Sequence, residues 1–274
     1  MEQNTLRKLQ LTQLSILKDF VKICEENDLK YFLDGGTMLG AVRHQGFIPW
    51  DDDLDVGMPR RDYDRFCKLA KKSLPKGYFL QTYFTDKNYP NAFAKLRKEG
   101  TEFVESITEK SKMRGGIYID ILPFDNFPEK KSEILSQGFE IELYKHLLIG
   151  KHRVYPWMGM KGKKRLFKFL EYAPFYPLAV FFDHDHLARK YDSTLKRYNK
   201  RTTDRIKEPD LRFAKVVVPA DCGTDLIDVD FEDGKYLIPN SYDSFLKQLY
   251  GNDYMTPPPV ESRGGWHGIK KLRF

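Results

Sequence analysis

The segment 50–56 (WDDDLDV) contains four aspartates, a residue type that supplies oxygen ligands to hard cations. On a β-strand successive side chains alternate between faces, so Asp51, Asp53 and Asp55 would point the same way, about two rises of ~3.3 Å apart. Carboxylates that close repel one another unless a cation neutralises them, and all-oxygen ligation suits Mg²⁺ or Mn²⁺ better than zinc. From Leu54 onward the alternate residues are apolar, which indicates a packed face. The pattern predicts a divalent metal site, and a solvated acidic loop is the alternative.

A glycine pair followed by a threonine precedes these aspartates, between a short apolar strand and a predicted helix. Gly35 and Gly36 would let backbone N–H groups approach an anion, and Thr37 would add a hydroxyl at the positive end of the helix. The turn would then hold phosphate oxygens, and the carboxylates would hold the metal that bridges them. A plain tight turn is the alternative. Arg43, in the segment between the two motifs, would either clamp a phosphate or face solvent.

A further carboxylate interrupts the apolar run 116–123 (GIYIDILP). Burying an unpaired carboxylate is costly, so we expect Asp120 to meet a cation or several hydrogen-bond donors. A metal site on the neighbouring strand would explain it, and a structural hydrogen bond to a turn is the alternative. Lys95 and Arg97 share a face of a predicted strand, where they would neutralise phosphates or act as solubility charges at an edge. Asp125 lies beyond the proline of this run and is predicted to be a cap or loop residue.

Other reactive motifs are weak or missing. In the segment 183–186 (DHDH), alternate residues of a helix would point to nearly opposite sides, which disfavours metal ligation. No serine occupies a G-x-S-x-G nucleophile elbow, and no lysine follows a glycine loop as in a Walker motif. The sequence therefore offers no candidate for covalent catalysis.

These residues must be positioned by strands and helices, which hydrophobic spacing predicts. Strands predominate in the first half and helices in the middle, about 129–205, so the fold class is predicted to be α+β. Predicted helices cover 5–26, 59–72, 184–200, a segment that starts at Thr37 and one that ends at Tyr250. Predicted strands cover 31–33, 54–58, 78–83, 93–104, 117–122 and 216–219.

The composition describes a chain that folds. Its 274 residues include 41% hydrophobic and 14% aromatic residues, which excludes collagen-like and disordered classes and suits one large domain or two small ones. Three cysteines are odd in number and form no C-x-x-C pair, which favours a reducing compartment. The start lacks the features of a secretory signal, and the longest apolar stretch, 173–182, is shorter than the ~18 residues that span a bilayer. We expect a cytoplasmic protein that at most rests on a membrane.

Positive charge is concentrated in one place. The chain carries 46 Lys+Arg against 39 Asp+Glu, a net charge of +7, and residues 151–168 hold seven basic residues and no acid. This cluster leads into aromatic-rich sequence, so the region 151–182 would either be a solvated basic face or contact an anionic membrane or polyanionic acceptor. No nucleic-acid partner is expected, because no recognised binding motif accompanies the charge.

The run 31–66 (YFLDGGTMLGAVRHQGFIPWDDDLDVGMPRRDYDRF) resembles the signature of the LicD family. Members of this family are phosphocholine transferases that modify bacterial surface glycans, and they are related to fukutin-type phosphotransferases. The resemblance continues through 115–125 (GGIYIDILPFD) and 231–259 (FEDGKYLIPNSYDSFLKQLYGNDYMTPPP). The middle, about 130–205, carries no motif of the family that we can place.

The resemblance implies a nucleotidyltransferase-like mixed sheet flanked by helices, with a mainly helical middle segment. It implies a single domain over 1–274, with a core at 28–128, a helical insertion at 129–205 and a closing segment at 206–274. In this family a glycine turn precedes a D-x-D pair, and a third acid follows later in the chain. Carried over, the catalytic residues are Asp53, Asp55 and Asp120, and the metal ligands are these three with Asp51, the leading aspartate of fukutin-type relatives. The expected substrate-binding residues are Gly35, Gly36, Thr37, Arg43 and Lys95.

The activity that the resemblance implies is Mg²⁺- or Mn²⁺-dependent transfer of a phospho-alcohol from a CDP-activated donor. CDP-choline is the donor of the best-known members, and the acceptor is a hydroxyl of a surface glycan such as lipopolysaccharide or teichoic acid, or its lipid-linked precursor at the inner membrane face. Attack on the phosphorus next to the alcohol would release CMP, and attack on the other would transfer a nucleotide. Transfer of a nucleotide, or of glycerol or ribitol phosphate, is the alternative. A binding protein without chemistry is disfavoured because the aspartates are all retained.

Overall fold

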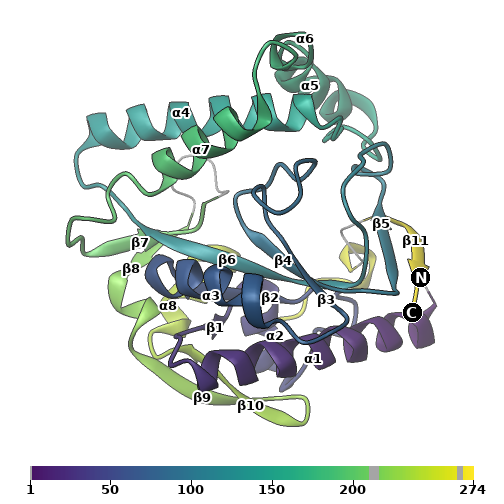
Figure 1. Cartoon of the computed structure of the whole chain (residues 1–274). Coiled ribbons are helices and arrows are strands. Elements are labelled where there is room, and N and C mark those ends of the chain that lie inside the picture. The colour runs from purple at the N-terminus through teal and green to yellow at the C-terminus, as the bar shows by residue number, and fades with distance from the viewer. Residues whose placement is uncertain (1, 210–215, 264–267) are drawn as a thin grey trace.

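The computed structural model describes residues 2–209, 216–263 and 268–274. A sheet of mixed strand direction lies at the centre, helices flank it, and the middle of the chain forms a further helical layer (Figure 1). This arrangement confirms the α+β class and the helical character of the middle segment. The division into three parts stays a prediction, and the predicted closing segment includes 210–215 and 264–267, which lie outside the described residues.

The central sheet has seven strands along the path β1-β2-β6-β4-β3, with β7 paired to β6 and β8 to β7. Strands β2 and β6 run parallel, and the other pairs of this sheet are antiparallel. Its strands are β1 (Phe32–Leu33), β2 (Asp55–Pro59), β3 (Tyr78–Gln81), β4 (Ala94–Lys98), β6 (Tyr118–Asn126), β7 (Arg205–Lys207) and β8 (Val217–Pro219). The described residues also form two separate two-stranded antiparallel sheets: the hairpin of β9 (Leu226–Phe231) and β10 (Gly234–Pro239), and the pair of β5 (Glu102–Glu105) with β11 (Ile269–Arg273), which is distant in the sequence.

The strand predicted at 93–104 is wrong as a single element. The chain turns after β4 at Gly100, whose φ of +79° lies in the left-handed region that glycine tolerates. Strand β5 then leaves the central sheet and pairs with β11. The two ends of the chain lie near each other (Figure 1). A period-2 pattern continues through such a turn, and therefore spacing alone could not reveal the break.

The prediction that Asp125 is a cap or loop residue is also wrong. Strand β6 continues through Pro123 to Asn126. On the side of β6 opposite β2, the pairing with β4 ends at Ile121 and the pairing with β7 begins at Asp125. Pro123 lies between these two pairings, where neither β4 nor β7 needs the N–H that proline lacks. Asp125 instead makes a buried two-bond ion pair with Arg60, with N–O distances of 2.8 and 2.6 Å.

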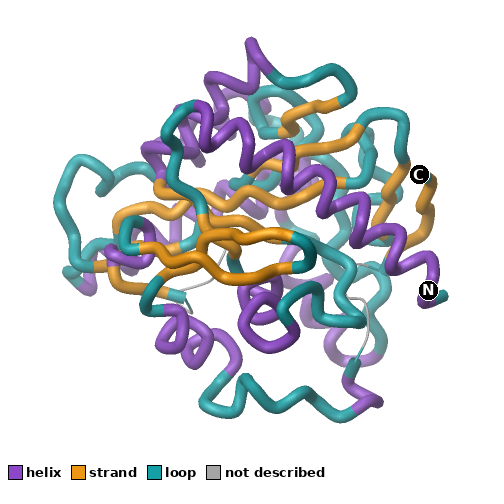
Figure 2. Tube along the Cα trace, turned by 90° about the horizontal axis from the view of Figure 1, so that it is seen from below, coloured by secondary structure: helices purple, strands orange, loops and turns teal. Residues whose placement is uncertain are grey.

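Four helices pack around the sheet, and their apolar faces are buried as the predicted periodicity requires. Phe20 and Phe66, from two of these helices, pack with their ring centroids 5.0 Å apart. From below, the first helix crosses the strands and the β9–β10 hairpin lies beside it (Figure 2). The helices are α1 (Gln3–Glu26), α2 (Gly35–His44), α3 (Arg60–Ser73) and α8 (Tyr242–Tyr250), with short 3-10 turns at Ala220–Gly223 and Val260–Ser262.

The middle of the chain forms a hydrophobic cluster of its own, in which Ile141 and Leu148 pack against Tyr191 and Leu195. Its helices are α4 (Lys131–Lys151), α5 (Gly162–Tyr172), α6 (Phe175–Ala179) and α7 (His184–Leu195). Among the described residues, none of the helices combines the length and the apolar character that crossing a membrane would require.

Candidate active site

The first turn of α2 follows directly from strand β1. Asp34 caps the helix, because its carboxylate accepts a hydrogen bond from the N–H of Gly35 at 2.8 Å. The backbone N–H of Asp34 donates to the carbonyl of Asp55 at 3.1 Å, which ties the helix start to strand β2. The helix therefore begins at Gly35, two residues before the predicted start at Thr37. Both glycines lie in the first turn, where backbone N–H groups have no partner within the helix and the helix dipole is positive.

Two aspartates lie directly against these glycines. A Cβ atom at Gly36 would be 2.9 Å from Asp51 Oδ2, and one at Gly35 would be 3.4 Å from Asp55 Oδ2. Gly35 also has a φ of +51°, which a residue with a side chain rarely adopts. The close approach of Asp51 thus requires glycine at position 36, and the backbone conformation favours glycine at position 35. The structure thus brings together the predicted turn and the predicted acids.

The acidic segment is only partly a strand. Strand β2 begins at Asp55, and residues 51–54 have no regular secondary structure, so the predicted alternation does not place the earlier acids. Asp51, Asp52 and Asp53 each offer a carboxylate oxygen, and these oxygens lie within 4.8 Å of one another, close enough to hold a metal ion. Asp52, which sequence reasoning passed over, is therefore part of the cluster.

Helix α1 holds this segment in place through two buried glutamines. Gln10 Nε2 donates to the carbonyl oxygen of Asp51 and Gln13 Nε2 to that of Asp52, both at 3.0 Å. Because these bonds satisfy backbone groups that no sheet partner reaches, the segment keeps its shape without being a strand. Two glutamines three residues apart on an otherwise apolar helix face were the signal available in the sequence.

Thr37 lies beside the site, with its hydroxyl directed at the backbone of Asp55. Its Oγ1 accepts the N–H of Asp55 at 2.8 Å, and the residue is buried. The cavity in front of the glycines does not include Thr37 in its lining. We therefore propose that Thr37 positions Asp55 instead of contacting substrate.

A cavity of about 600 Å³ opens in front of the helix N-terminus. Arg43 is the one cation among the described residues that line it, and its guanidinium donates to the carbonyl of Tyr254 at 2.7 Å. Tyr250, at the end of α8, reaches in from the opposite wall, with its hydroxyl 3.9 Å from a Cβ placed at either glycine. The acids of the lining include Asp34, Asp51, Asp53, Asp55, Glu208 and Asp253.

Burial perturbs the protonation of two carboxyl groups of the site, those of Asp55 and Asp34. Burial raises the pKa of the Asp55 carboxyl well above its ordinary value, and the charges of Asp53, Asp120 and other neighbouring aspartates add to the rise. Burial also raises the pKa of Asp34 to about 7, against the opposing effect of its hydrogen bonds to Gly35 and Glu208. Both carboxyls are therefore harder to ionise than an exposed aspartate.

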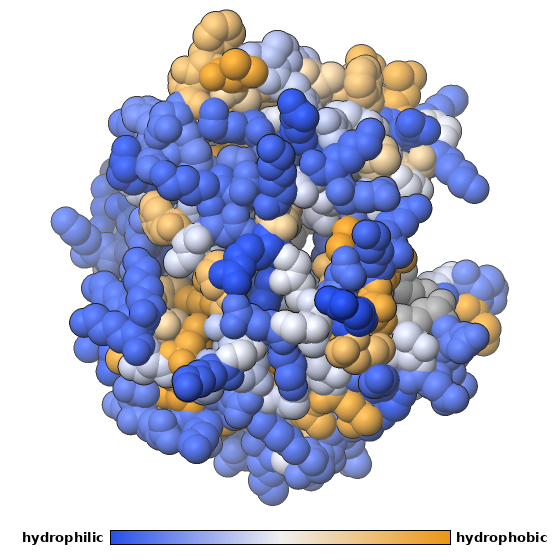
Figure 3. Space-filling model, turned by 45° about the vertical axis from the view of Figure 1, so that its right-hand side comes forward, coloured by the Kyte–Doolittle hydropathy of each residue, from blue (hydrophilic) through white to orange (hydrophobic). Residues whose placement is uncertain are grey.

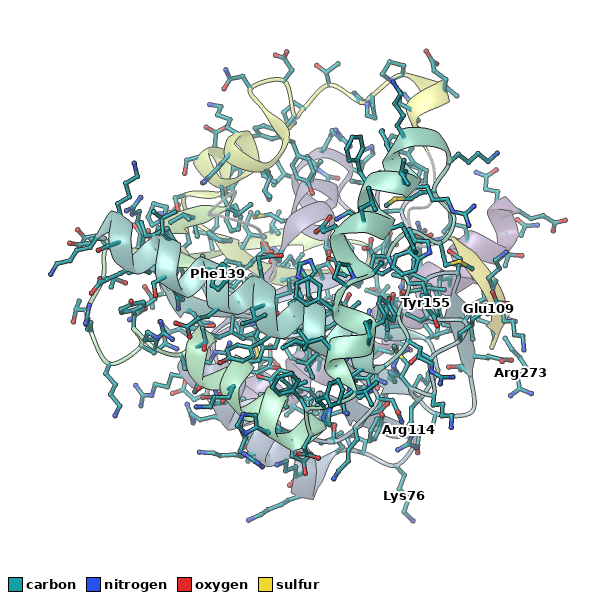
Figure 4. The ribbon with its side chains drawn as sticks, turned by 90° about the horizontal axis from the view of Figure 1, so that it is seen from above. Lys76, Glu109, Arg114, Phe139, Tyr155 and Arg273 are labelled. Atoms are coloured by element: carbon teal, nitrogen blue, oxygen red, sulfur yellow. The ribbon has the colours of Figure 1, made fainter. Side chains whose placement is uncertain are left out.

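Asp120 is the register partner of Asp55 across the parallel pair β2–β6, and it lines a second cavity of about 840 Å³. Lys95 lies in this second cavity, with its Nζ 2.9 Å from Asp120 Oδ1 and 3.4 Å from the centre of the Tyr118 ring. The two cavities thus lie on either side of the Asp55–Asp120 pair. In Figure 4, Glu109, Arg114 and Arg273, which also line the second cavity, lie on one side of the molecule.

The interior position of Lys95 and Arg97 excludes the interpretation as solubility charges. Both side chains are buried, and β4 lies between β6 and β3 in the sheet and not at its edge. Arg97 donates to the carbonyl of Gly116 at 2.7 Å and to Gln81 Oε1 at 2.6 Å, so it holds neighbouring segments together. Lys95 is the cation that Asp120 was expected to meet.

Comparison with known proteins identifies the family. A family model described as LicD/FKTN/FKRP, nucleotidyltransferase domain, matches residues 28–161. The lipopolysaccharide cholinephosphotransferase LicD of Haemophilus influenzae is 30% identical over 277 residues, which cover 97% of this chain and 97% of that protein. The chain belongs to the LicD family. The similarity of this LicD chain to its relative therefore extends over the helical middle, where no motif could be placed.

Other relatives match shorter parts of the LicD chain. An uncharacterized protein of Rickettsia prowazekii is 33% identical over 122 residues, which cover 44% of this chain and 42% of that protein. The ribitol 5-phosphate transferase FKRP of Mus musculus is 45% identical over 42 residues, which cover 15% of this chain and 8% of that protein.

Besides Asp52, two further residues of the LicD site were not predicted although their patterns were visible. Asp34 stands directly before a glycine pair at a strand end, which is typical of a helix cap. Tyr250 belongs to the closing segment that resembles the family, and partial burial with the nearby carboxylates raises the pKa of its hydroxyl, so it stays a hydrogen-bond donor. Each needed the tertiary structure to be placed beside the aspartates.

Proposed function

We propose that this chain transfers a phospho-alcohol, phosphocholine from CDP-choline, to a hydroxyl of a cell-surface glycan or its lipid-linked precursor at the cytoplasmic face of the membrane. The observation that carries the proposal is the approach of Asp51 and Asp55 to the first turn of α2 at Gly35 and Gly36. A relative of nearly the same length that is named a cholinephosphotransferase supports the same reaction class.

The donor set fits a hard divalent cation, because every candidate ligand is a carboxylate oxygen. We propose Mg²⁺ or Mn²⁺ as the cofactor, held by Asp51, Asp53 and Asp55, with Asp120 beside Asp55 as the third acid of the family pattern. When bound, such an ion would draw negative charge from a diphosphate.

The chain's own groups would bind the donor. The N–H group of Gly36 would donate to a phosphate oxygen, whereas that of Gly35 already donates to the Asp34 carboxylate. The Arg43 guanidinium, which lines the same cavity, would contact the diphosphate. A quaternary ammonium suits the same cavity, because its lining also includes Glu208 and Asp253, which are not among the proposed metal ligands, and Trp50, Tyr250 and Tyr254 supply aromatic rings. This lining supports choline over an uncharged polyol.

The transfer itself would take place beside the register pair of Asp55, which lines the first cavity, and Asp120, which lines the second. The acceptor oxygen forms a bond to the phosphorus that carries the alcohol, and the bond from that phosphorus to the bridging oxygen breaks, so CMP leaves with the electron pair. The proton of the acceptor hydroxyl passes to a carboxylate, for which we propose Asp120 because it lines the second cavity. Lys95 neutralises and orients that carboxylate through its ion pair.

Product analysis tests the proposal. Purified protein with Mg²⁺ or Mn²⁺ would be given CDP-choline, CDP-ethanolamine, CDP-glycerol and CDP-ribitol with a glycan acceptor, and CMP and pyrophosphate would be measured. We expect CMP, with CDP-choline turned over fastest. We expect Asp55→Asn to abolish turnover without unfolding the chain, whereas Asp228→Asn, on the exposed face of β9, should keep it. Pyrophosphate as the product, or an active Asp55→Asn variant, would overturn the proposal.

One alternative has a specific observation in its favour. The 42-residue match to a ribitol 5-phosphate transferase keeps polyol phosphate transfer open for the same site. A CDP-ribitol turnover number above that for CDP-choline would favour this alternative and would contradict the role proposed for the aromatic and acidic lining.

A further inference from the structure

Helix α5 and the segment 173–182, which we call the α5–α6 surface, expose large apolar side chains to solvent. Figure 3 shows hydrophobic side chains gathered at the top of the molecule over these elements, with hydrophilic side chains below them. Phe167 is 70% exposed and Phe181 is 84% exposed. The exposed apolar residues include Leu166, Phe167, Phe169, Leu170, Val180 and Phe181.

This exposure is not the scattered kind found on every soluble protein. In α5 only Tyr172 is buried, and it packs in one cluster with Val154. Phe169 contacts Trp157, with ring centroids 5.2 Å apart, whereas Leu166, Phe167 and Leu170 are more than half exposed. An amphipathic helix with its apolar side outward leaves its hydrophobic area without a partner inside the chain. Such a surface indicates an apolar partner outside it.

The charge next to this apolar area identifies the partner. Residues 151–182 contain seven basic residues and one acid, so they carry six of the chain's seven net positive charges. In α5 the basic residues Lys163, Lys164 and Arg165 stand at the start of the helix and are exposed beside the apolar side. A second copy of this chain would present the same positive charge and be repelled, whereas anionic headgroups over an acyl layer match both features.

We propose that the α5–α6 surface docks on an anionic lipid bilayer, with α5 lying in the interface, its apolar side toward the acyl chains and its basic residues at the headgroups. The elements are too short to span a bilayer, so the contact is peripheral. Because the basic residues bind anionic headgroups, the contact weakens as ionic strength rises. Partial loss of binding at high salt separates this mode from purely hydrophobic insertion.

The docking surface lies directly above the cavity that contains Asp120. Val154 and Met113 line that cavity, and the same two residues pack against Tyr172 and Tyr176 under the α5–α6 surface. One layer of side chains therefore separates the second cavity from the membrane face. A consequence, which rests on the proposed function, is that a lipid-linked acceptor would enter this cavity from the membrane side.

Flotation with lipid vesicles tests the docking independently of activity. Full-length protein would be mixed with phosphatidylcholine vesicles that contain 0 or 30% phosphatidylglycerol, and the floating fraction measured at low and high salt. We expect binding only to the anionic vesicles, weakened at high salt. Phe167→Ser with Leu170→Ser should lower the binding constant by about tenfold or more, and Lys163→Glu with Lys164→Glu should lower it similarly.

Leu11→Ser is the matched control, because Leu11 is an exposed apolar residue on α1, on the far side of the molecule from α5 (Figure 1). This variant should bind vesicles as the wild-type chain does. Turnover with a short soluble acceptor should be unchanged in all these variants, so failure of docking and failure of the proposed function give different results. The proposal is overturned if the wild-type chain does not float with anionic vesicles or if the Phe167/Leu170 variant floats as the wild type does. It is also overturned if that variant changes the oligomeric state from dimer to monomer without changing vesicle binding.

Discussion

Replacing Gly36 by alanine tests whether the Asp51 carboxylate is held in a reactive position at the start of α2. The added Cβ would lie 2.9 Å from Asp51 Oδ2, whereas ordinary contact begins at 3.4 Å, so the carboxylate must move by about 0.5 Å. The contact is with the end of a flexible side chain, and the φ of Gly36 is not positive. The backbone can therefore accept alanine while the acidic cluster cannot keep its arrangement.

The expected magnitudes differ for activity and stability. A displacement of about 1 Å in an active site can lower the rate by ~10²-fold, so a shift of half that size should lower kcat by about 10-fold to 100-fold, or roughly 1.4 to 2.7 kcal/mol. Alanine is favoured over glycine within a helix by at most about 1 kcal/mol. We therefore expect the free energy of unfolding to stay within about 1 kcal/mol of the wild-type value.

The assay combines CMP release at saturating CDP-choline with urea denaturation of the same preparations. Gly40→Ala is the contrasting variant, because its Cβ would lie 2.5 Å from the backbone oxygen of Gly46, which cannot move cheaply. It should lose about 1 to 3 kcal/mol of stability. Adding Gly36→Ala to Asp51→Ala should cost little further activity, since the contact is already gone. Wild-type kcat in the Gly36→Ala variant, at unchanged stability, would refute the placement of Asp51.

Three further predictions concern protonation, a buried ion pair and the metal. The His152 ring is partly buried beside His184, with 2.8 Å between their nearest ring nitrogens. Burial lowers the pKa of His152 to about 4, and the positive charges of His184 and Lys151 add to the effect. Between pH 6.5 and 4, therefore, His152 binds a proton in the unfolded chain but not in the folded one. The contribution of His152 to the free energy of unfolding should fall by about 3 kcal/mol as the pH falls through that range and keep its higher value above it. The raised pKa values of Asp34 and Asp55 act in the opposite direction over the same range, so the difference in stability between the wild type and His152→Asn is followed by urea denaturation at each pH. A difference that does not change with pH would contradict the prediction. Arg60→Met should lower the free energy of unfolding by about 3 to 5 kcal/mol, because it leaves the Asp125 carboxylate buried without its guanidinium partner. The double variant Arg60→Met with Asp125→Leu should recover part of that loss. Urea denaturation measures both, and no recovery in the double variant would count against a charge effect. Calorimetric titration with Mn²⁺ should show binding that Asp53→Asn weakens by about tenfold, roughly 1.4 kcal/mol, and equal affinity would exclude Asp53 as a ligand.

Much of the site could be predicted because its signals are local in the chain. A glycine pair between a strand and a helix, and aspartates beside a packed apolar strand, are patterns within about ten residues, and both elements formed near the expected positions. The predicted ends of these elements differ from the structure: α2 starts at Gly35 instead of Thr37, and β2 starts at Asp55 instead of Leu54. Capping by Asp34 and hydrogen bonds from α1 decide these ends, and neither changes the hydrophobic period on which the prediction rested.

The sequence by itself determined the reactive residue types, the α+β class and the concentration of positive charge at 151–168, because composition, period and spacing are properties of the chain alone. Only the tertiary structure decided that Gln13 reaches the acidic segment, that Arg60 meets Asp125 and that Tyr250 faces Gly36. It also decided which side of α5 faces outward. These partners are distant in the chain, and their meeting depends on how whole strands and helices pack, a choice that no short stretch of residues contains.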